Sequence, residues 1–194
     1  KEIGETLYRL KNFGIRGPEV VDGVGANAKM NEFCAAMGLC NLRHIDQEIA
    51  KRQSVVEKYR EHLGTVPGIK LCDNQPHVKM NYAYFPVLFD EKVFGFNRND
   101  VFNKLAENNI FARKYFYPLT NTFDCFYGKY DVSKTPIAQH IAKTVLTLPL
   151  YADISLEDVD HVSNIILEMA AVKRNRSNSV GKGQGSPIFT GIFG

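Results

Sequence analysis

The sequence has no tryptophan, little net charge and no apolar run as long as a membrane span. A transmembrane helix needs about 20 consecutive apolar residues, and the N-terminal KEIGETLYRLK lacks the apolar core of a signal peptide. The net charge is only +3 over 194 residues, and much of the basic excess lies after residue 172. We therefore expect a cytoplasmic protein that contacts neither membrane nor nucleic acid.

Cysteine and histidine are too few and too scattered to suggest a metal centre. None of the four cysteines belongs to a C-x-x-C pair, and the five histidines form no H-E-x-x-H motif. The expected role of the cysteines is that of small buried thiols in a reducing compartment. We predict no metal site.

The chain is organised around the stretch from Gly23 to Leu63, which contains no proline. Asn31 is a good N-cap for a helix that continues to Leu63. The first part of this helix, residues 33–40 (FCAAMGLC), is apolar on every side, as in a helix that is buried all round. In the second part the apolar residues share one face, which predicts packing on a smaller domain; they are Ile45, Ile49, Val56, Tyr59 and Leu63.

Shorter elements are predicted on both sides of this helix. Before it lies a short helix, Glu2–Lys11, and a turn-rich segment. After it we predict strands at 69–72, 80–89, 110–113 and 145–148, and helices at 100–107, 136–144 and from 155 onward. Pro86 lacks a donor for a sheet ladder, so we place it on an edge or at a bulge. The pattern indicates a small α/β (α+β) domain with a mixed sheet.

Two segments have no regular periodicity. Residues 114–133 are rich in tyrosine and phenylalanine, which either fill a core beneath a long loop or line a pocket. From Lys173 the chain becomes polar and then glycine-rich. We expect residues 173–194 to be disordered or foreign to the native protein.

Several motifs together resemble one enzyme family. The segment GANAKMNEFCAAMGLCNL resembles the pattern G-x-N-x-R-M-x-E-x-x-A-A-x-G-L-x-x-L of the DegT/DnrJ family of sugar-nucleotide aminotransferases. The resemblance continues in NYAYFPVLF (81–89), ARKYFYPLT (112–120) and VLTLPLYADISLEDV (145–159). It covers roughly residues 5–172, with the motifs in the family's order.

The resemblance implies a fold and a domain organisation. Members are pyridoxal 5'-phosphate (PLP) enzymes of the aspartate-aminotransferase type, fold type I, and the match is to their C-terminal portion. It implies that residues 1–30 end a large PLP domain, and that residues 31–172 form a long interfacial helix and a small domain. It also implies a homodimer with active sites at the interface.

The resemblance locates the cofactor mainly outside this chain. The Schiff-base lysine and the acid that pairs with the pyridine nitrogen lie upstream of the matched region in the family, so no catalytic residue is assigned here. The family's asparagine at the position of Asn27 reaches the PLP phosphate of the partner subunit. An amide on a glycine-flanked turn can donate to a phosphate oxygen. The alternative is that Asn27 is only a turn residue.

Five further residues are candidates for binding the substrate. Lys29 replaces the usual arginine of the motif, which keeps the charge but loses the bidentate fork. Arg113 and Lys114 are candidates to bind a nucleotide diphosphate, or else form a solvated basic pair. Tyr115 and Tyr117 are candidates to line the pocket.

The family resemblance implies amination of a nucleotide-linked keto-deoxysugar, with an amino acid, glutamate by analogy, as the donor. An alternative is a non-catalytic assembly or regulatory module with the same small-domain fold. The absence of the lysine motif favours this alternative. The retained GANAKM turn and YFYPL segment argue against it.

Overall fold

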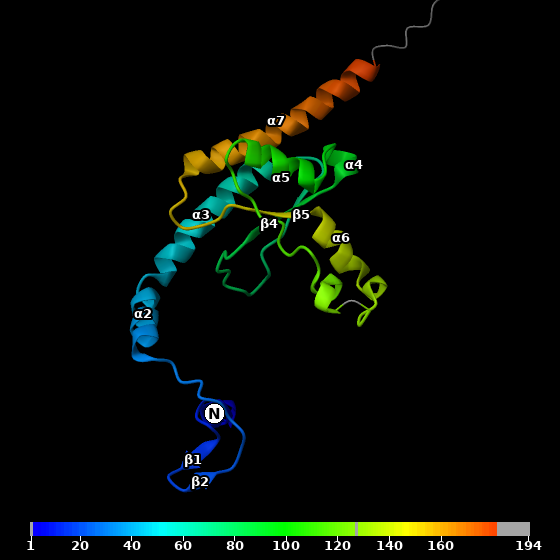
Figure 1. The fold of residues 1–194 in the computed structure, drawn as a ribbon. Helices are drawn as coiled ribbons and strands as arrows, with labels where there is room; N and C mark the ends of the chain where they lie inside the picture. Colours follow the sequence, from blue (N-terminus) through cyan, green and yellow to red (C-terminus); the bar gives the residue numbers. More distant parts are fainter. Residues whose placement is uncertain (1, 127, 182–194) are drawn as a thin grey trace, which may run out of the picture. The chain divides into compact units, whose positions relative to one another are not determined.

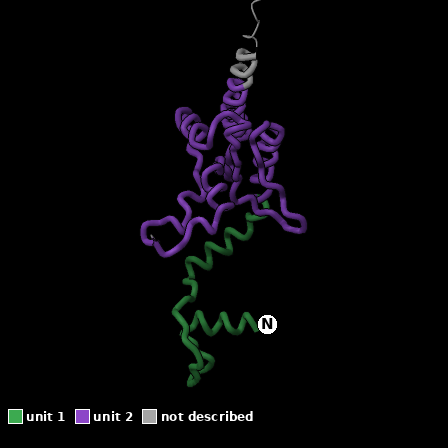
Figure 2. Tube along the Cα trace, turned by 90° about the vertical axis from the view of Figure 1, so that its right-hand side faces the viewer, with its two compact units in different colours: residues 1–47 green, residues 48–194 purple. Residues whose placement is uncertain are grey.

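A computed structural model describes residues 2–126 and 128–181 of the chain (Figure 1). The chain divides into two compact units, one that ends at residue 47 and one that begins at residue 48 (Figure 2). We describe each unit by itself. The fold class predicted from the sequence, helices with a small sheet, is confirmed.

The first unit begins with the predicted helix, α1 (Glu2–Lys11), and continues into a hairpin that the sequence did not indicate. Its strands, β1 (Ile15–Gly17) and β2 (Val20–Val21), are antiparallel. Glycines let the chain fold back closely on the end of α1. A Cβ atom added to Gly25 would lie 2.6 Å from the Gly14 nitrogen and 2.7 Å from the Leu10 carbonyl oxygen.

The single helix predicted up to Leu63 is wrong, because the structure has two helices: α2 (Glu32–Leu42) and α3 (Ile45–Leu63). Between them the N–H groups of Arg43 and His44 bond to carbonyls three residues back, which interrupts the i→i−4 ladder. The predicted cap is confirmed, since the Asn31 side chain accepts a hydrogen bond of 2.8 Å from the Cys34 N–H.

The second unit is built on a three-stranded sheet in the order β3 (Ile69–Leu71), β4 (Phe85–Phe89) and β5 (Val145–Leu148). Each strand runs antiparallel to its neighbour, so the prediction of a mixed sheet is wrong for these strands. The predicted strand at 110–113 is reduced to an isolated bridge between Arg113 and Thr147.

Pro86 lies in the central strand rather than at an edge or a bulge, which corrects the prediction. Thr147, its partner on β5, directs both its N–H and its carbonyl to Arg113. In an antiparallel pair the two backbone groups of a residue point to the same side. The nitrogen of Pro86 therefore faces away from β5, toward the side where β3 has already ended at Leu71. No ladder hydrogen bond is lost.

Four helices accompany the sheet: α4 (Glu91–Phe94), α5 (Arg98–Glu107), α6 (Pro136–Thr144) and α7 (Leu156–Gly181). Helix α5 begins at Arg98, two residues before the predicted start, and is capped by Asn97, which forms a reciprocal capping box with Asp100. Pro136 occupies the first turn of α6, as predicted. Three short 3-10 helices interrupt the aromatic segment, at Thr120–Thr122, Asp124–Phe126 and Val132–Lys134.

The core lies on one face of the sheet, beneath α3, α5 and α7 (Figure 1). Tyr59 of α3 stacks on Phe85 at 5.1 Å between ring centroids, and its hydroxyl donates to the Pro149 carbonyl over 3.1 Å. Burial raises the pKa of the Tyr59 phenol. Each large apolar side chain buried in this way contributes about 1.5–3 kcal/mol to folding.

The remaining expectations concern the tail, the membrane and the cysteines. Helix α7 extends to Gly181, so residues 173–181 of the predicted tail are helical, while 182–194 lie outside the described residues. No helix within the described ranges has the length and apolar character to cross a membrane. The cysteines were expected to be buried; all four are exposed.

The turn after α3 generates a prediction about stability. Gly68 has a positive φ of +83°, and a Cβ atom there would lie 2.3 Å from the Phe94 nitrogen. Gly128 has a similar φ of +73° with nothing within 4 Å of the added atom. We expect Gly128→Ala to lower the free energy of unfolding by about 1 kcal/mol and Gly68→Ala by more than about 2 kcal/mol.

Urea denaturation of both variants measures the difference. Because φ is similar at the two positions, the excess loss at Gly68 reports the clash with Phe94. Equal losses in the two variants would contradict this account.

Candidate substrate-binding groove

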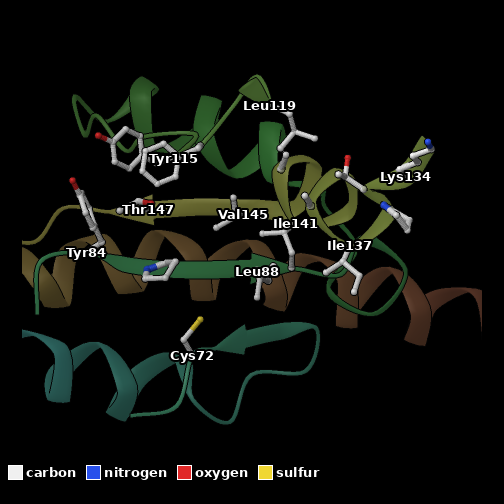
Figure 3. A pocket seen from close by; sticks show the side chains of 16 residues that line it. Cys72, Tyr84, Leu88, Tyr115, Leu119, Lys134, Ile137, Ile141, Val145 and Thr147 are labelled. Carbon is white, nitrogen blue, oxygen red and sulfur yellow. The ribbon is translucent and has the colours of Figure 1, made fainter. Parts of the chain in front are cut away.

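The face of the sheet opposite the core forms the floor of an apolar groove of about 970 Å³ (Figure 3). Side chains alternate along a strand, so Phe85, Val87 and Phe89 of β4 enter the core, while Pro86 and Leu88 line the groove. On β5, Val145 and Thr147 extend the same floor.

One wall of the groove is helix α6. Ile137 and Ile141 are four residues apart, so they lie on the same face of the helix, and both point into the groove (Figure 3). Ile137 is nonetheless 78% exposed. Exposed apolar side chains that gather along a groove are typical of a ligand-binding surface.

The opposite end of the groove is aromatic. Tyr115 stacks on Phe116 at 4.1 Å between ring centroids, and Tyr84 lies 5.1 Å from Tyr115 (Figure 3). A hydrogen bond with Tyr115 raises the pKa of the Tyr84 phenol. The structure therefore brings the predicted Tyr115 to the groove, together with Tyr84, which the sequence analysis did not single out.

The Arg113 and Lys114 side chains have different surroundings. The backbone of Arg113 pairs with Thr147 through hydrogen bonds of 3.0 and 2.8 Å, which leaves its side chain exposed. The Lys114 ammonium lies 4.4 Å from the centre of the Phe102 ring on α5.

Tyr117 lies outside the groove lining and contacts Arg98 instead. The Arg98 guanidinium carbon is 5.0 Å from the centre of the Tyr117 ring. Arg98 is only 3% exposed and was not singled out from the sequence. The sequence offered no signal for its burial, because an arginine at the start of a helix is ordinarily solvated.

Asn27 and Lys29 belong to the first unit. The backbone of Asn27 forms a bridge with Asn12, and its side chain is exposed and makes no hydrogen bond to any residue that the structure describes. The Lys29 ammonium donates to the Asn12 side chain over 3.1 Å and lies 4.8 Å from the Phe13 ring. Of the two, Asn27 offers donors that remain available for a ligand.

The groove itself is poor in reactive groups. Lys134, Thr135 and Thr147 provide polar side chains, and Cys72 lies at its lower edge (Figure 3). No cluster of three or more potential metal ligands occurs within residues 2–126 and 128–181. The arrangement is suited to binding and orienting a ligand with a substantial apolar surface.

Comparison with known proteins places the chain among aminotransferases. Residues 1–167 match the DegT/DnrJ/EryC1/StrS aminotransferase family. A dTDP-4-amino-4,6-dideoxy-D-glucose transaminase from Escherichia coli is 40% identical over 163 residues, which are 83% of this chain and 44% of that protein.

Solved structures share the fold. The structure of DesI in the presence of its TDP-sugar product superimposes with a TM-score of 0.74 at 30% identity, over 90% of this chain and 44% of that one. The structure of S. venezuelae DesV gives a TM-score of 0.77 at 23% identity, over 87% and 44%. The chain thus spans less than half the length of these relatives.

The pair of tyrosines in the groove gives a testable prediction. Tyr115→Phe removes the hydroxyl that bonds Tyr84, so the pKa of the Tyr84 phenol should fall toward its ordinary value. Because the raised pKa favours the protonated phenol in the folded state, this contribution to stability is present below the ordinary tyrosine pKa and is lost as the pH rises past it.

Alkaline titration followed by NMR of isotope-labelled tyrosine rings measures the pKa. Tyr130→Phe, the same chemical change at an exposed position of the same loop, is the control and should leave Tyr84 unaltered. An unchanged Tyr84 titration in Tyr115→Phe would refute the contact.

Proposed function

The chain belongs to the DegT/DnrJ/EryC1/StrS aminotransferase family, and we propose that it is the C-terminal part of a PLP-dependent enzyme that aminates a nucleotide-linked keto-deoxysugar. The carbonyl oxygen of the sugar is replaced by an amino group, and the amino acid donor, glutamate, becomes the corresponding 2-keto acid. The observation that carries this proposal is the 40% identity with a dTDP-sugar transaminase.

The groove supports a substrate of this kind. A deoxysugar and a pyrimidine base both present apolar and planar surfaces, which pack on aliphatic and aromatic side chains. We assign Tyr115 to this contact, since its ring lines the groove. We assign Tyr117 to the same binding segment, beside the groove.

The charged part of the substrate needs cationic partners. The exposed Arg113 side chain can pair with a diphosphate through two parallel hydrogen bonds. Lys114 offers a point charge beside Phe102. We propose both as diphosphate contacts, and Lys29 as a weaker contact because it is already bonded to Asn12.

The cofactor PLP, when bound, supplies the carbonyl group that carries the amino group between donor and acceptor. The residues of this chain fit a supporting role toward it. The Asn27 side chain is exposed, is free of hydrogen bonds to any described residue and lies on a glycine-flanked turn, so it can donate to a phosphate oxygen. We propose that the lysine that holds PLP lies outside these 194 residues.

A homodimer completes the proposal. Residues 33–40 of helix α2 are all apolar, yet no residue of the helix is buried, and Phe33 is 89% exposed. A helix of this composition needs apolar cover. We propose that the rest of the enzyme and a second subunit supply it, which brings Asn27 toward the partner's cofactor.

An amination assay tests the proposed function. The full-length protein that contains this chain, given PLP, glutamate and a dTDP-linked 4-keto-6-deoxysugar, should yield an amino sugar and 2-oxoglutarate in equal amounts, measured by mass spectrometry. Residues 1–194 alone should yield neither product.

Two results would contradict the proposal. Amination by residues 1–194 alone would show that the catalytic lysine lies within the chain. A full-length protein that folds and binds PLP but aminates no nucleotide sugar would favour the non-catalytic module.

The role of Asn27 is tested by cofactor affinity. A hydrogen bond to a charged group contributes about 1.5–3 kcal/mol, so Asn27→Ala should weaken PLP binding by about 10- to 100-fold, measured by equilibrium dialysis of the full-length protein. Asn31→Ala, which removes the cap of α2, is the matched control and should leave the affinity within about twofold. If the two variants bind PLP equally well, Asn27 is only a turn residue.

A further inference from the structure

Arg98 is a buried cation in an unfavourable place. It is the first residue of α5, where the helix dipole is positive and a cation is disfavoured. It is 3% exposed, and no carboxylate of a described residue pairs with it. Desolvation lowers the pKa of the Arg98 guanidinium. An apolar side chain of similar size would usually be more stabilising at such a site.

The Arg98 guanidinium makes three contacts that partly offset the cost of its burial. Its Nε donates to the Asn99 side chain over 3.0 Å, and its Nη1 donates to the Val145 carbonyl over 3.0 Å. Its guanidinium carbon lies 5.0 Å from the Tyr117 ring. One planar group therefore joins the start of α5, the start of β5 and the aromatic segment.

Two of the three contacts, those with Val145 and Tyr117, hold segments that border the groove. The Val145 side chain lines the groove floor while its carbonyl is held by Arg98. Tyr117 directly follows Tyr115 and Phe116, which form the aromatic end of the groove. Fixing Tyr117 and Val145 thus fixes the two segments between which a ligand in the groove would lie.

We propose that Arg98 is a positioning residue that orders the segment 115–117 against β5 and so sets the shape of the groove for the nucleotide-sugar substrate. The inference rests on the proposed function for the identity of that substrate. Lysine does not replace arginine here, because an ammonium lacks the planar fork that donates to both Asn99 and Val145 while it lies over the Tyr117 ring.

The first test follows the segment itself and needs no substrate. Arg98→Lys in the full-length protein should speed amide hydrogen exchange at residues 113–117. Lys104→Ala removes an exposed cation of the same helix, whose ammonium bonds Glu107 at 3.2 Å, and should not alter exchange in that segment. Unchanged exchange in Arg98→Lys would overturn the proposal.

The second test follows the substrate. Both changes remove the contact between the guanidinium and the ring, so Arg98→Lys and Tyr117→Leu should each raise KM for the nucleotide sugar about 2- to 30-fold. The affinity for PLP should stay within about twofold. Tyr117→Phe, which keeps the aromatic ring, should raise KM less than Tyr117→Leu does. The double variant should raise KM no further than the stronger single variant, because both changes remove one interaction.

A purely structural role for Arg98 predicts a different result. Arg98→Lys would then lower the free energy of unfolding while KM stayed unchanged, which would overturn the proposal. If Arg98→Lys fails to fold, the KM of Tyr117→Leu tests the proposal instead. An unchanged KM in Tyr117→Leu would also overturn the proposal.

Failure of the proposed function is recognised separately. A wild-type protein that binds PLP but no nucleotide sugar would refute the substrate and overturn the substrate part of this inference. Even in that case, faster amide hydrogen exchange at residues 113–117 in Arg98→Lys would support the proposal that Arg98 orders this segment.

Discussion

The second unit depends on the two faces of strand β4. Phe85, Val87 and Phe89 anchor the helices of the core, and the residues between them, Pro86 and Leu88, form the floor of the groove. A strand with apolar residues at every position must be covered on both sides. Helices α3, α5 and α7 cover one side, whereas α6 and the aromatic segment cover the other only in part. The groove is thus a consequence of the same alternation that builds the core.

Much of this fold could be predicted from local signals. Pro136 and the apolar run after Thr144 located α6 and β5 at their observed bounds. Local signals failed where several residues competed: Asn97, Asn99 and Asp100 can each cap a helix, and only the reciprocal bonds of Asn97 and Asp100 decide between them. The break between α2 and α3 at Arg43 and His44 contains neither proline nor glycine, so nothing in the sequence marked it. Pro86 was misplaced because its tolerance depends on where the neighbouring strand β3 ends.

The candidate site divides in the same way. Tyr115 could be found because it stands in a motif that resembles a family, and the structure brings it to the groove. The role of Arg98 could not be predicted, since it depends on contacts with Val145 and Tyr117, which are distant from it in sequence. Ile137 and Ile141 carried a weak signal, an apolar pair four residues apart on a short helix. Such long-range relations are set by packing and leave little trace in local composition.

The cost of burying Arg98 bears on how the groove keeps its form. The segment from Lys114 to Thr135 contains only short 3-10 helices within the described residues, so few backbone ladders restrain it. Apolar packing alone is non-directional and would allow its aromatic rings several arrangements. A guanidinium that donates to two fixed acceptors and lies over one aromatic ring favours one arrangement. A charged residue that is unfavourable for stability alone therefore has a reason to stand beside a groove whose shape matters for binding.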